Sequence, residues 1–190
     1  MRLFVAVDIP HDPIFHRLHS ELKGISRRLR PVDPANQHIS LKFLGDPGVS
    51  QKKVIDVLKG IDIRGEEEAL VTDRIGAFPS WKKASVLWIG FSGSGLLERL
   101  SAGIDEALHE RIGTPRESRS FRPHITIARI KGRDAFETEE ASAVMQRALD
   151  DLISKDYSIP LKGFHLYNST LTPDGPVYRK IASFGIRTEE

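Results

Sequence analysis

A four-residue pattern occurs twice in this chain, and each copy lies in a run of residues typical of a β-strand. The copies are His38-Ile39-Ser40-Leu41 and His124-Ile125-Thr126-Ile127. Because side chains alternate between the two faces of a strand, the histidine and the hydroxyl residue share one face and the aliphatic residues face the core. The pattern therefore predicts two half-buried strands, each presenting an imidazole beside a hydroxyl.

The elements around the two copies repeat in the same order: strand, helix, histidine strand, helix, strand. This order indicates an internal duplication with repeats at about 1–80 and 84–170, followed by a final strand at 177–184. The expected strands are Leu3–Ile9, a first histidine strand ending at Leu44, Glu68–Ile75, Val86–Phe91, Phe121–Ile130 and Tyr157–Tyr167. The expected helices are Ile14–Leu29, one from an N-cap at Ser50 to Leu58, Ser94–Ile112 and Ala135–Ile153.

The duplication predicts an α+β fold of two pseudo-symmetric lobes within a single bilobal domain spanning residues 1–190. Each lobe is expected to hold a mainly antiparallel sheet with helices on its outer face. The two histidines then face each other across a cleft between the sheets, which is the usual position of a small-ligand site. A hydrophobic content of 39% in 190 residues suits one substantial folded unit.

Composition excludes several kinds of chemistry. The chain has no cysteine, so disulfides, thiolate nucleophiles and cysteine-ligated metals are ruled out. The first ten residues do not form a signal peptide, and no apolar run has transmembrane length, so we expect a cytoplasmic protein. The net charge of +2 leaves local basic patches as the means of binding RNA. A run with Arg27, Arg28 and Arg30 suits a helix C-terminus, and it also suits contact with an RNA backbone.

The paired imidazoles and hydroxyls favour a phosphate site. A single strand histidine is usually structural, but two copies with matching hydroxyls favour an active site in which two imidazoles give and take protons. The two hydroxyls can hydrogen-bond the oxygens of one phosphate. The remaining histidines lack a companion hydroxyl and are interpreted as surface or structural residues. They are His11, His16, His19, His109 and His165.

Five stretches of the chain resemble the 2H phosphoesterase superfamily, and more narrowly the RNA 2',3'-cyclic phosphodiesterase (2'-5' RNA ligase) family. The stretches follow the family's order along nearly the whole chain. They are Phe4–Pro10, His38–Gly45, Gly76–Pro79, Phe121–Arg129, and the tail with Leu166–Ser169 and Gly175–Tyr178. Ser40 departs from the threonine more common in the family but keeps the hydroxyl.

The resemblance implies hydrolysis of the terminal 2',3'-cyclic phosphate of RNA to a 2'-phosphate, without a metal or another cofactor. It assigns His38 as proton donor and His124 as proton acceptor, while Ser40 and Thr126 hold the non-bridging oxygens. From the residues alone the order of the two histidines stays open, because the pair is nearly symmetric. The expected partner is RNA with a terminal 2',3'-cyclic phosphate, such as tRNA halves, bound by a monomer that does not associate with a membrane.

Supporting residues follow from strand alternation. Lys42 falls on the His38 face and is a candidate phosphate contact, with a solvated strand lysine as the equal alternative. Arg129 falls on the face opposite His124, so its contact with phosphate requires a twist or a bulge near the strand end.

Aromatic residues near the motifs are candidates for stacking on a terminal base. Phe121 and Tyr167 are retained as substrate-binding candidates, whereas Phe43 and Phe78 are expected to pack in the core.

Three other functions remain as alternatives. The physiological reaction can be ATP-independent joining of tRNA halves through a 2'-5' bond, or the protein can bind RNA ends without turnover. A metal-dependent phosphoesterase requires clustered ligands, and the acidic residues near the motifs, Asp33 and Asp46, lack ligand spacing.

Overall fold

The structure is a computed structural model that describes residues 2–61, 64–65, 68–92, 95–132, 138–173 and 175–188. Four α-helices and two short 3-10 helices lie within these ranges, together with eleven strands. The elements are β1 Arg2–Asp8, α1 Pro13–Ile25, β2 Leu29–Pro31, η1 Pro34–Asn36, β3 His38–Gly45, α2 Gln51–Lys59, β4 Arg64–Gly65, β5 Ala69–Phe78, η2 Trp81–Lys83, β6 Val86–Ser92, α3 Gly95–Ile112, β7 His124–Ile130, α4 Thr138–Ser154, β8 Ser158–Pro160, β9 Gly163–Thr172, β10 Gly175–Gly185 and β11 Arg187–Thr188.

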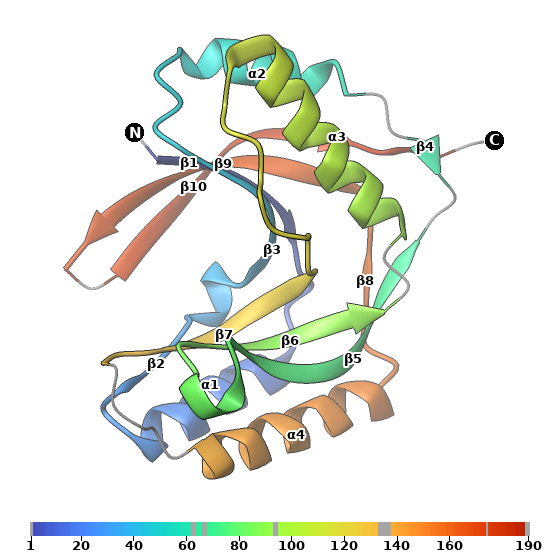
Figure 1. The fold of residues 1–190 in the computed structure, drawn as a ribbon. Coiled ribbons are helices and arrows are strands. Elements are labelled where there is room, and N and C mark those ends of the chain that lie inside the picture. Colours follow the sequence, from blue (N-terminus) through green and yellow to red (C-terminus); the bar gives the residue numbers. More distant parts are fainter. Residues whose placement is uncertain are drawn as a thin grey trace.

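Nine strands form one curled sheet in the order β10-β9-β1-β3-β7-β6-β5-β8, with β2 paired to β7 (Figure 1). Every pairing in this sheet is antiparallel. The predicted α+β class is therefore confirmed. The two halves of the sheet meet edge to edge at β3 and β7, where a single register pair, Ile39 with Ile125, joins them. We call this pair the seam.

The sheet defines two lobes, one on each side of the seam. The first lobe holds β10, β9, β1 and β3 with α2 and α3, and the second holds β8, β5, β6, β7 and β2 with α1 and α4 (Figure 1). The strand order is symmetric about the seam, because the last strand of each expected repeat crosses to the other lobe. β5 pairs with β6, and β9 pairs with β1. The lobes are therefore not the sequence repeats, and the internal duplication stays a prediction.

Local signals explain the helix starts. The Asp12 side chain accepts a hydrogen bond from the Ile14 backbone at 2.8 Å, with Pro13 at the first helical position. The Ser50 hydroxyl accepts from the Lys53 backbone at 3.3 Å, which confirms the predicted cap. The predicted starts of two later helices, Ser94 and Ala135, lie outside the described residues.

Two element boundaries predicted from the sequence are wrong. Helix α1 ends at Ile25 rather than Leu29, because Leu29 is buried by pairing with Ile130 in the short strand β2 and not by the helix stripe. The single strand expected over 157–167 is two strands. The chain leaves β5 after β8 and joins β1 through β9, so Pro160 and Gly163 mark a crossing between lobes.

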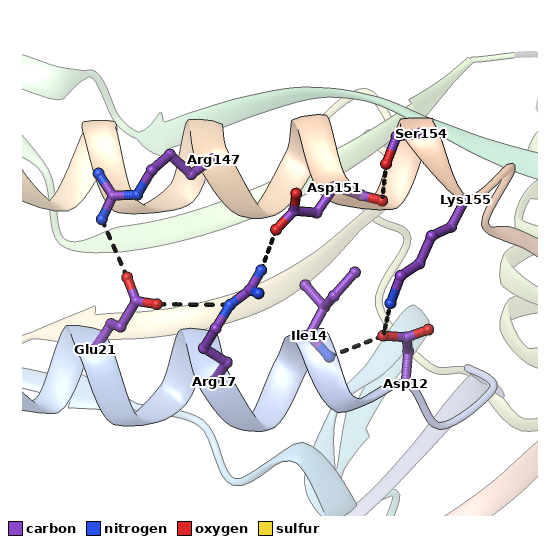
Figure 2. A network of polar contacts seen from close by, with 8 residues as sticks. All are labelled: Asp12, Ile14, Arg17, Glu21, Arg147, Asp151, Ser154 and Lys155. Atoms are coloured by element: carbon purple, nitrogen blue, oxygen red, sulfur yellow. Dashed lines mark hydrogen bonds and ion pairs between the residues drawn. The ribbon is translucent and has the colours of Figure 1, made fainter.

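Helices α1 and α4 lie side by side and share a row of ion pairs, shown in Figure 2. Arg17 pairs with Asp151, and Glu21 accepts from Arg147 at 3.1 Å. These side chains are about half exposed, so each pair contributes little to stability. The buried faces of the helices supply the packing instead. In the described part of the chain, no helix combines the length and apolar character needed to cross a membrane.

Candidate active site

The seam brings the two histidine motifs onto one face of the sheet. Ile39 and Ile125 are opposite each other and fully buried, so their side chains point into the core. The residues on either side of them point the other way, because side chains alternate along both strands. Antiparallel pairing then places His38 next to Thr126 and Ser40 next to His124. We call these four residues the quartet, and the face that carries them the cleft face.

Each histidine strand has a bulge at the last residue of its motif. In β3 the register with β1 shifts so that Leu41 is the extra residue, and in β7 the register with β6 shifts so that Ile127 is the extra residue. Both strands consequently bury two residues in a row before returning to the cleft face. The residues that return are Phe43 and Arg129, which occupy equivalent positions in the two lobes.

Backbone carbonyls orient both imidazoles in the same way. His38 Nδ1 lies 2.8 Å from the carbonyl oxygen of Asn36, and His124 Nδ1 lies 2.6 Å from that of Arg122. A carbonyl oxygen only accepts, so each Nδ1 carries the proton in the neutral ring and each Nε2 is left with its lone pair. His38 Nε2 lies 3.0 Å from Ser40 Oγ, whose hydroxyl donates to it.

The pKa values of both imidazoles lie below their usual value of 6.5. Burial is the main cause at each ring, because it disfavours the charged form. The positive charge of His124 also lowers the pKa of His38, and that of Arg129 lowers the pKa of both. The three groups are thus within electrostatic reach of one another.

An acidic residue distinguishes the two histidines. Asp8 pairs in register with His38 across β1 and β3, and its charge raises the pKa of that imidazole against the effect of burial. Asp8 also accepts hydrogen bonds from Tyr167 and, at 2.6 Å, from Lys180.

Aromatic rings pack around each imidazole. The His38 ring lies 5.0 Å from Phe4 and 5.4 Å from Tyr178, between ring centroids, and His124 lies 5.1 Å from Phe78. The Trp88 ring contacts the same group, with its centroid 5.1 Å from that of Phe78 and 6.1 Å from that of His124.

A pocket of about 230 Å³ opens beside His38. Its walls include Phe4, Asn36, Tyr167 and Tyr178. Tyr167 stacks on Phe4 at 5.2 Å and donates its hydroxyl to Asp8. The predicted candidate Tyr167 therefore lies in the wall of this pocket, whereas Phe121 is half-buried against the core and is not part of the wall.

The structure contradicts the expected position of Lys42. Its side chain is 5% exposed, its Nζ lies 2.5 Å from Asp105 Oδ1, and the same atom donates to the Pro115 carbonyl at 2.7 Å. Strict alternation placed Lys42 on the His38 face, but the bulge at Leu41 turns it away. Lys42 therefore fixes the segment before His124 to helix α3 and is removed from the cleft face.

The β7 bulge has the opposite consequence for Arg129. The sequence required a bulge for Arg129 to share a face with His124, and the structure has one. The expectation that Phe43 packs in the core is wrong for the same reason, since the β3 bulge leaves its side chain 64% exposed. Phe78 does pack half-buried, against Trp88 and His124.

Four residues beside the imidazoles carry no signal in the motifs: Phe4, Asp8, Trp88 and Tyr178. Residues 3–7 of β1 are all buried, so this strand has no alternation that would single out one side chain. Among the described residues, no group of three or more histidine, aspartate or glutamate side chains is arranged to hold a metal ion.

Comparisons with known proteins agree with this fold. The family model described as LigT like phosphoesterase matches residues 7–88 and 92–178. A relative from Archaeoglobus fulgidus, named RNA 2',3'-cyclic phosphodiesterase, is 30% identical and covers 97% of this chain and 99% of its own. A relative of the same name from Methanocaldococcus jannaschii is 32% identical, with 95% and 98% covered.

Solved structures show the same architecture. The crystal structure of a protein from Thermus thermophilus matches with a TM-score of 0.74 and 25% identity, and each chain is covered completely. Escherichia coli LigT, solved in complex with 3'-AMP, matches with a TM-score of 0.67 and 24% identity over 97% of each chain. The family model and the named relatives identify a phosphoesterase. The chain belongs to the LigT-like phosphoesterase family.

Proposed function

We propose that this protein hydrolyses the 2',3'-cyclic phosphate at the 3' end of RNA and leaves a 2'-phosphate. The observation that carries the proposal is the quartet, in which two imidazoles share one face with two hydroxyls. Backbone carbonyls hold both Nδ1 atoms, so each neutral ring keeps its Nε2 lone pair for proton transfer, and at His38 that atom accepts from the Ser40 hydroxyl. The names of the relatives from Archaeoglobus fulgidus and Methanocaldococcus jannaschii support this choice of substrate.

In the proposed reaction, His124 Nε2 accepts a proton from a water molecule as the water oxygen attacks phosphorus. The bond between phosphorus and the ribose 3' oxygen breaks, and the protonated Nε2 of His38 donates a proton to that oxygen. The products are a 2'-phosphate and a 3'-hydroxyl, with the protonation states of the two imidazoles exchanged. Positioned acids and bases of this type each contribute roughly 10²- to 10⁴-fold to the rate.

Asp8 supports the assignment of His38 as the acid. Its carboxylate favours the charged imidazole at His38, whereas no described carboxylate raises the pKa of His124, and Arg129 disfavours the charged form of both rings. The bound phosphodiester carries one negative charge, which further favours a protonated acid. The neutral base is thus His124.

The phosphate oxygens are proposed to bind the remaining polar groups of the cleft face. The Ser40 and Thr126 hydroxyls hold the non-bridging oxygens, and Arg129 adds positive charge where negative charge accumulates in the transition state. The pocket beside His38 receives the terminal nucleoside, whose base contacts Tyr178, Phe4 or Tyr167.

The test uses an RNA oligonucleotide that ends in a 2',3'-cyclic phosphate, incubated with the protein in the presence of a chelator. Wild-type protein is expected to form the 2'-phosphate end, identified by chromatography against 2'- and 3'-phosphate standards. His38→Ala and His124→Ala should each lower kcat by at least about 10²-fold. His19→Ala is the matched control, because His19 lies on α1 outside the cleft face.

Three results contradict the proposal. Binding of the cyclic end without hydrolysis identifies an RNA-end binder, and loss of activity in chelator identifies a metal-dependent reaction. Formation of a 2'-5' bond in preference to hydrolysis, when an RNA with a 5'-hydroxyl is added, identifies a ligase.

A further inference from the structure

Two arginines lie directly opposite each other at the end of the cleft face. Arg30 of β2 is in register with Arg129 of β7, and both are exposed. The next pair along the strands, Leu29 with Ile130, is buried. Paired residues of an antiparallel sheet share a face, so both guanidinium groups are on the cleft face.

This pairing is unfavourable for the fold alone. Like charges directly opposite each other on neighbouring strands are destabilising. Within the described ranges, neither Arg30 nor Arg129 has an ion pair or a side-chain hydrogen bond that offsets the repulsion. An anion bound between or beside them offsets it.

The position of β2 connects this arginine pair to the quartet. β3 pairs with β7 at Ile125, and β2 takes over the same edge of β7 from Ala128 to Ile130. Arg30 is therefore next to Arg129 on the side away from β6. On the other side, η2 carries the exposed Lys82 and Lys83 just before β6, whose Val86 is in register with Arg129.

The two arginines and the two η2 lysines all lie on the second lobe. The equivalent of Arg129 in the first lobe is Phe43, which pairs with Phe4 and so places an aromatic ring at the matching position. A single-stranded RNA combines stacking bases with a charged backbone, and the aromatic and basic ends of the cleft face offer one surface for each. The RNA backbone is then expected to run past the arginine pair.

We propose that Arg30 binds the phosphate that joins the last two nucleotides of the RNA, while Arg129 faces the terminal cyclic phosphate. This inference rests on the proposed function and adds a substrate class to it. A cyclic mononucleotide has no second phosphate, so it gains nothing from Arg30. The protein therefore selects the ends of RNA chains over free 2',3'-cyclic nucleotides.

The experiment compares two substrates, adenosine 2',3'-cyclic phosphate and a trinucleotide with a 2',3'-cyclic end. Arg30→Ala is expected to lower kcat/KM for the trinucleotide about tenfold relative to its effect on the mononucleotide, as one charged hydrogen bond to phosphate implies. Arg99→Ala is the matched control, since it removes the same charge from the exposed side of α3.

A salt titration separates phosphate binding from a structural role. Binding of the trinucleotide product with a 2'-phosphate is measured at increasing KCl concentration. Loss of one phosphate contact reduces the slope of log K against log salt by about 0.7 for a single strand. Arg30→Lys retains the charge and should keep the wild-type slope. Arg30→Ala should unfold at the wild-type temperature or above it, because a repulsive pair is removed.

An equal loss on both substrates, an unchanged salt slope, or the same effects in Arg99→Ala overturn the inference. A wild-type protein that cleaves the mononucleotide but shows no preference for the trinucleotide overturns it too, while the proposed phosphodiesterase chemistry stands. If neither substrate is hydrolysed the proposed function fails, and the product titration still decides the role of Arg30.

Discussion

Lys42 can be tested sharply, because the sequence offered a phosphate contact or a solvated strand lysine and the structure places it in a buried ion pair. Its side chain is 5% exposed and that of its partner Asp105 is 15% exposed. Replacement by methionine keeps the length of the chain and removes the ammonium. Of its hydrogen bonds from described residues, Asp105 then keeps the one at 3.0 Å from the Glu117 backbone.

The expected loss of stability follows from this environment. Breaking a buried pair by removing one partner costs roughly 3–5 kcal/mol, and we take about 3 because Asp105 is partly exposed and retains one donor. For a chain of 190 residues, this loss corresponds to a decrease in Tm of about 6–12 °C. Lys53→Met, on the exposed side of α2, is the control and should change Tm by much less.

The loss depends on pH in a defined direction. Burial raises the pKa of Asp105, but the hydrogen bonds from Lys42 and from the Glu117 backbone lower it further, so that the pKa lies below its usual value. A carboxylate with a lowered folded pKa adds stability above its unfolded pKa, and this stability is lost as the pH falls through the folded pKa. The difference between wild type and Lys42→Met should therefore be largest at neutral pH and shrink in acid.

The assays are thermal unfolding across pH and kcat/KM measured well below Tm. Folded Lys42→Met should retain catalysis within about tenfold, since loss of a transition-state contact costs roughly 10²–10³ in kcat. The double variant Lys42→Met/Asp105→Leu should regain most of the stability, because an apolar pair can replace a buried ion pair. Unchanged Tm together with a hundredfold loss of kcat would refute the reasoning and return Lys42 to the phosphate.

Two further predictions concern the imidazoles. Because burial lowers the pKa of both His38 and His124 below 6.5, kcat/KM should be highest below pH 6.5. Asp8→Asn removes the charge that raises the pKa of His38, so it should move the alkaline limb of the pH profile to lower pH. A profile in which Asp8→Asn leaves that limb in place contradicts this electrostatic assignment. Gly76→Ala places a methyl carbon 2.1 Å from the Trp88 ring and should cost about 1–3 kcal/mol of stability. The displaced Trp88 ring neighbours His124, so kcat/KM should fall as well. Wild-type values of Tm and kcat/KM would show that Trp88 moves aside without cost.

Alternation within single strands made most of the fold accessible to sequence analysis. The pattern in 38–41 and 124–127 is local, so it identified β3, β7 and the four side chains that share a face. The helix starts followed from capping residues such as Ser50. These features depend on contacts within a few residues, which the sequence displays directly.

Features that depend on neighbouring strands were not accessible. A bulge shifts the register by one residue and reverses the face of everything after it, so alternation failed for Lys42 and for Phe43 and needed the bulge for Arg129. Leu29 fits a helical stripe equally well and is buried by β7 instead. The joining of both halves into one sheet depends on the Ile39–Ile125 pair, which nothing in either motif specifies.

The exchange of strands across the seam has a consequence for dividing the chain. Both neighbours of β5 in the sheet, β6 and β8, come later in the sequence than η2. A break at η2 would leave β5 on a fragment without either of its neighbours, and β1 would lose β9. Each piece would then carry one histidine motif and one strand that belongs to the sheet around the other motif. The two segments are thus complementary parts that become a catalytic unit only when they fold around each other.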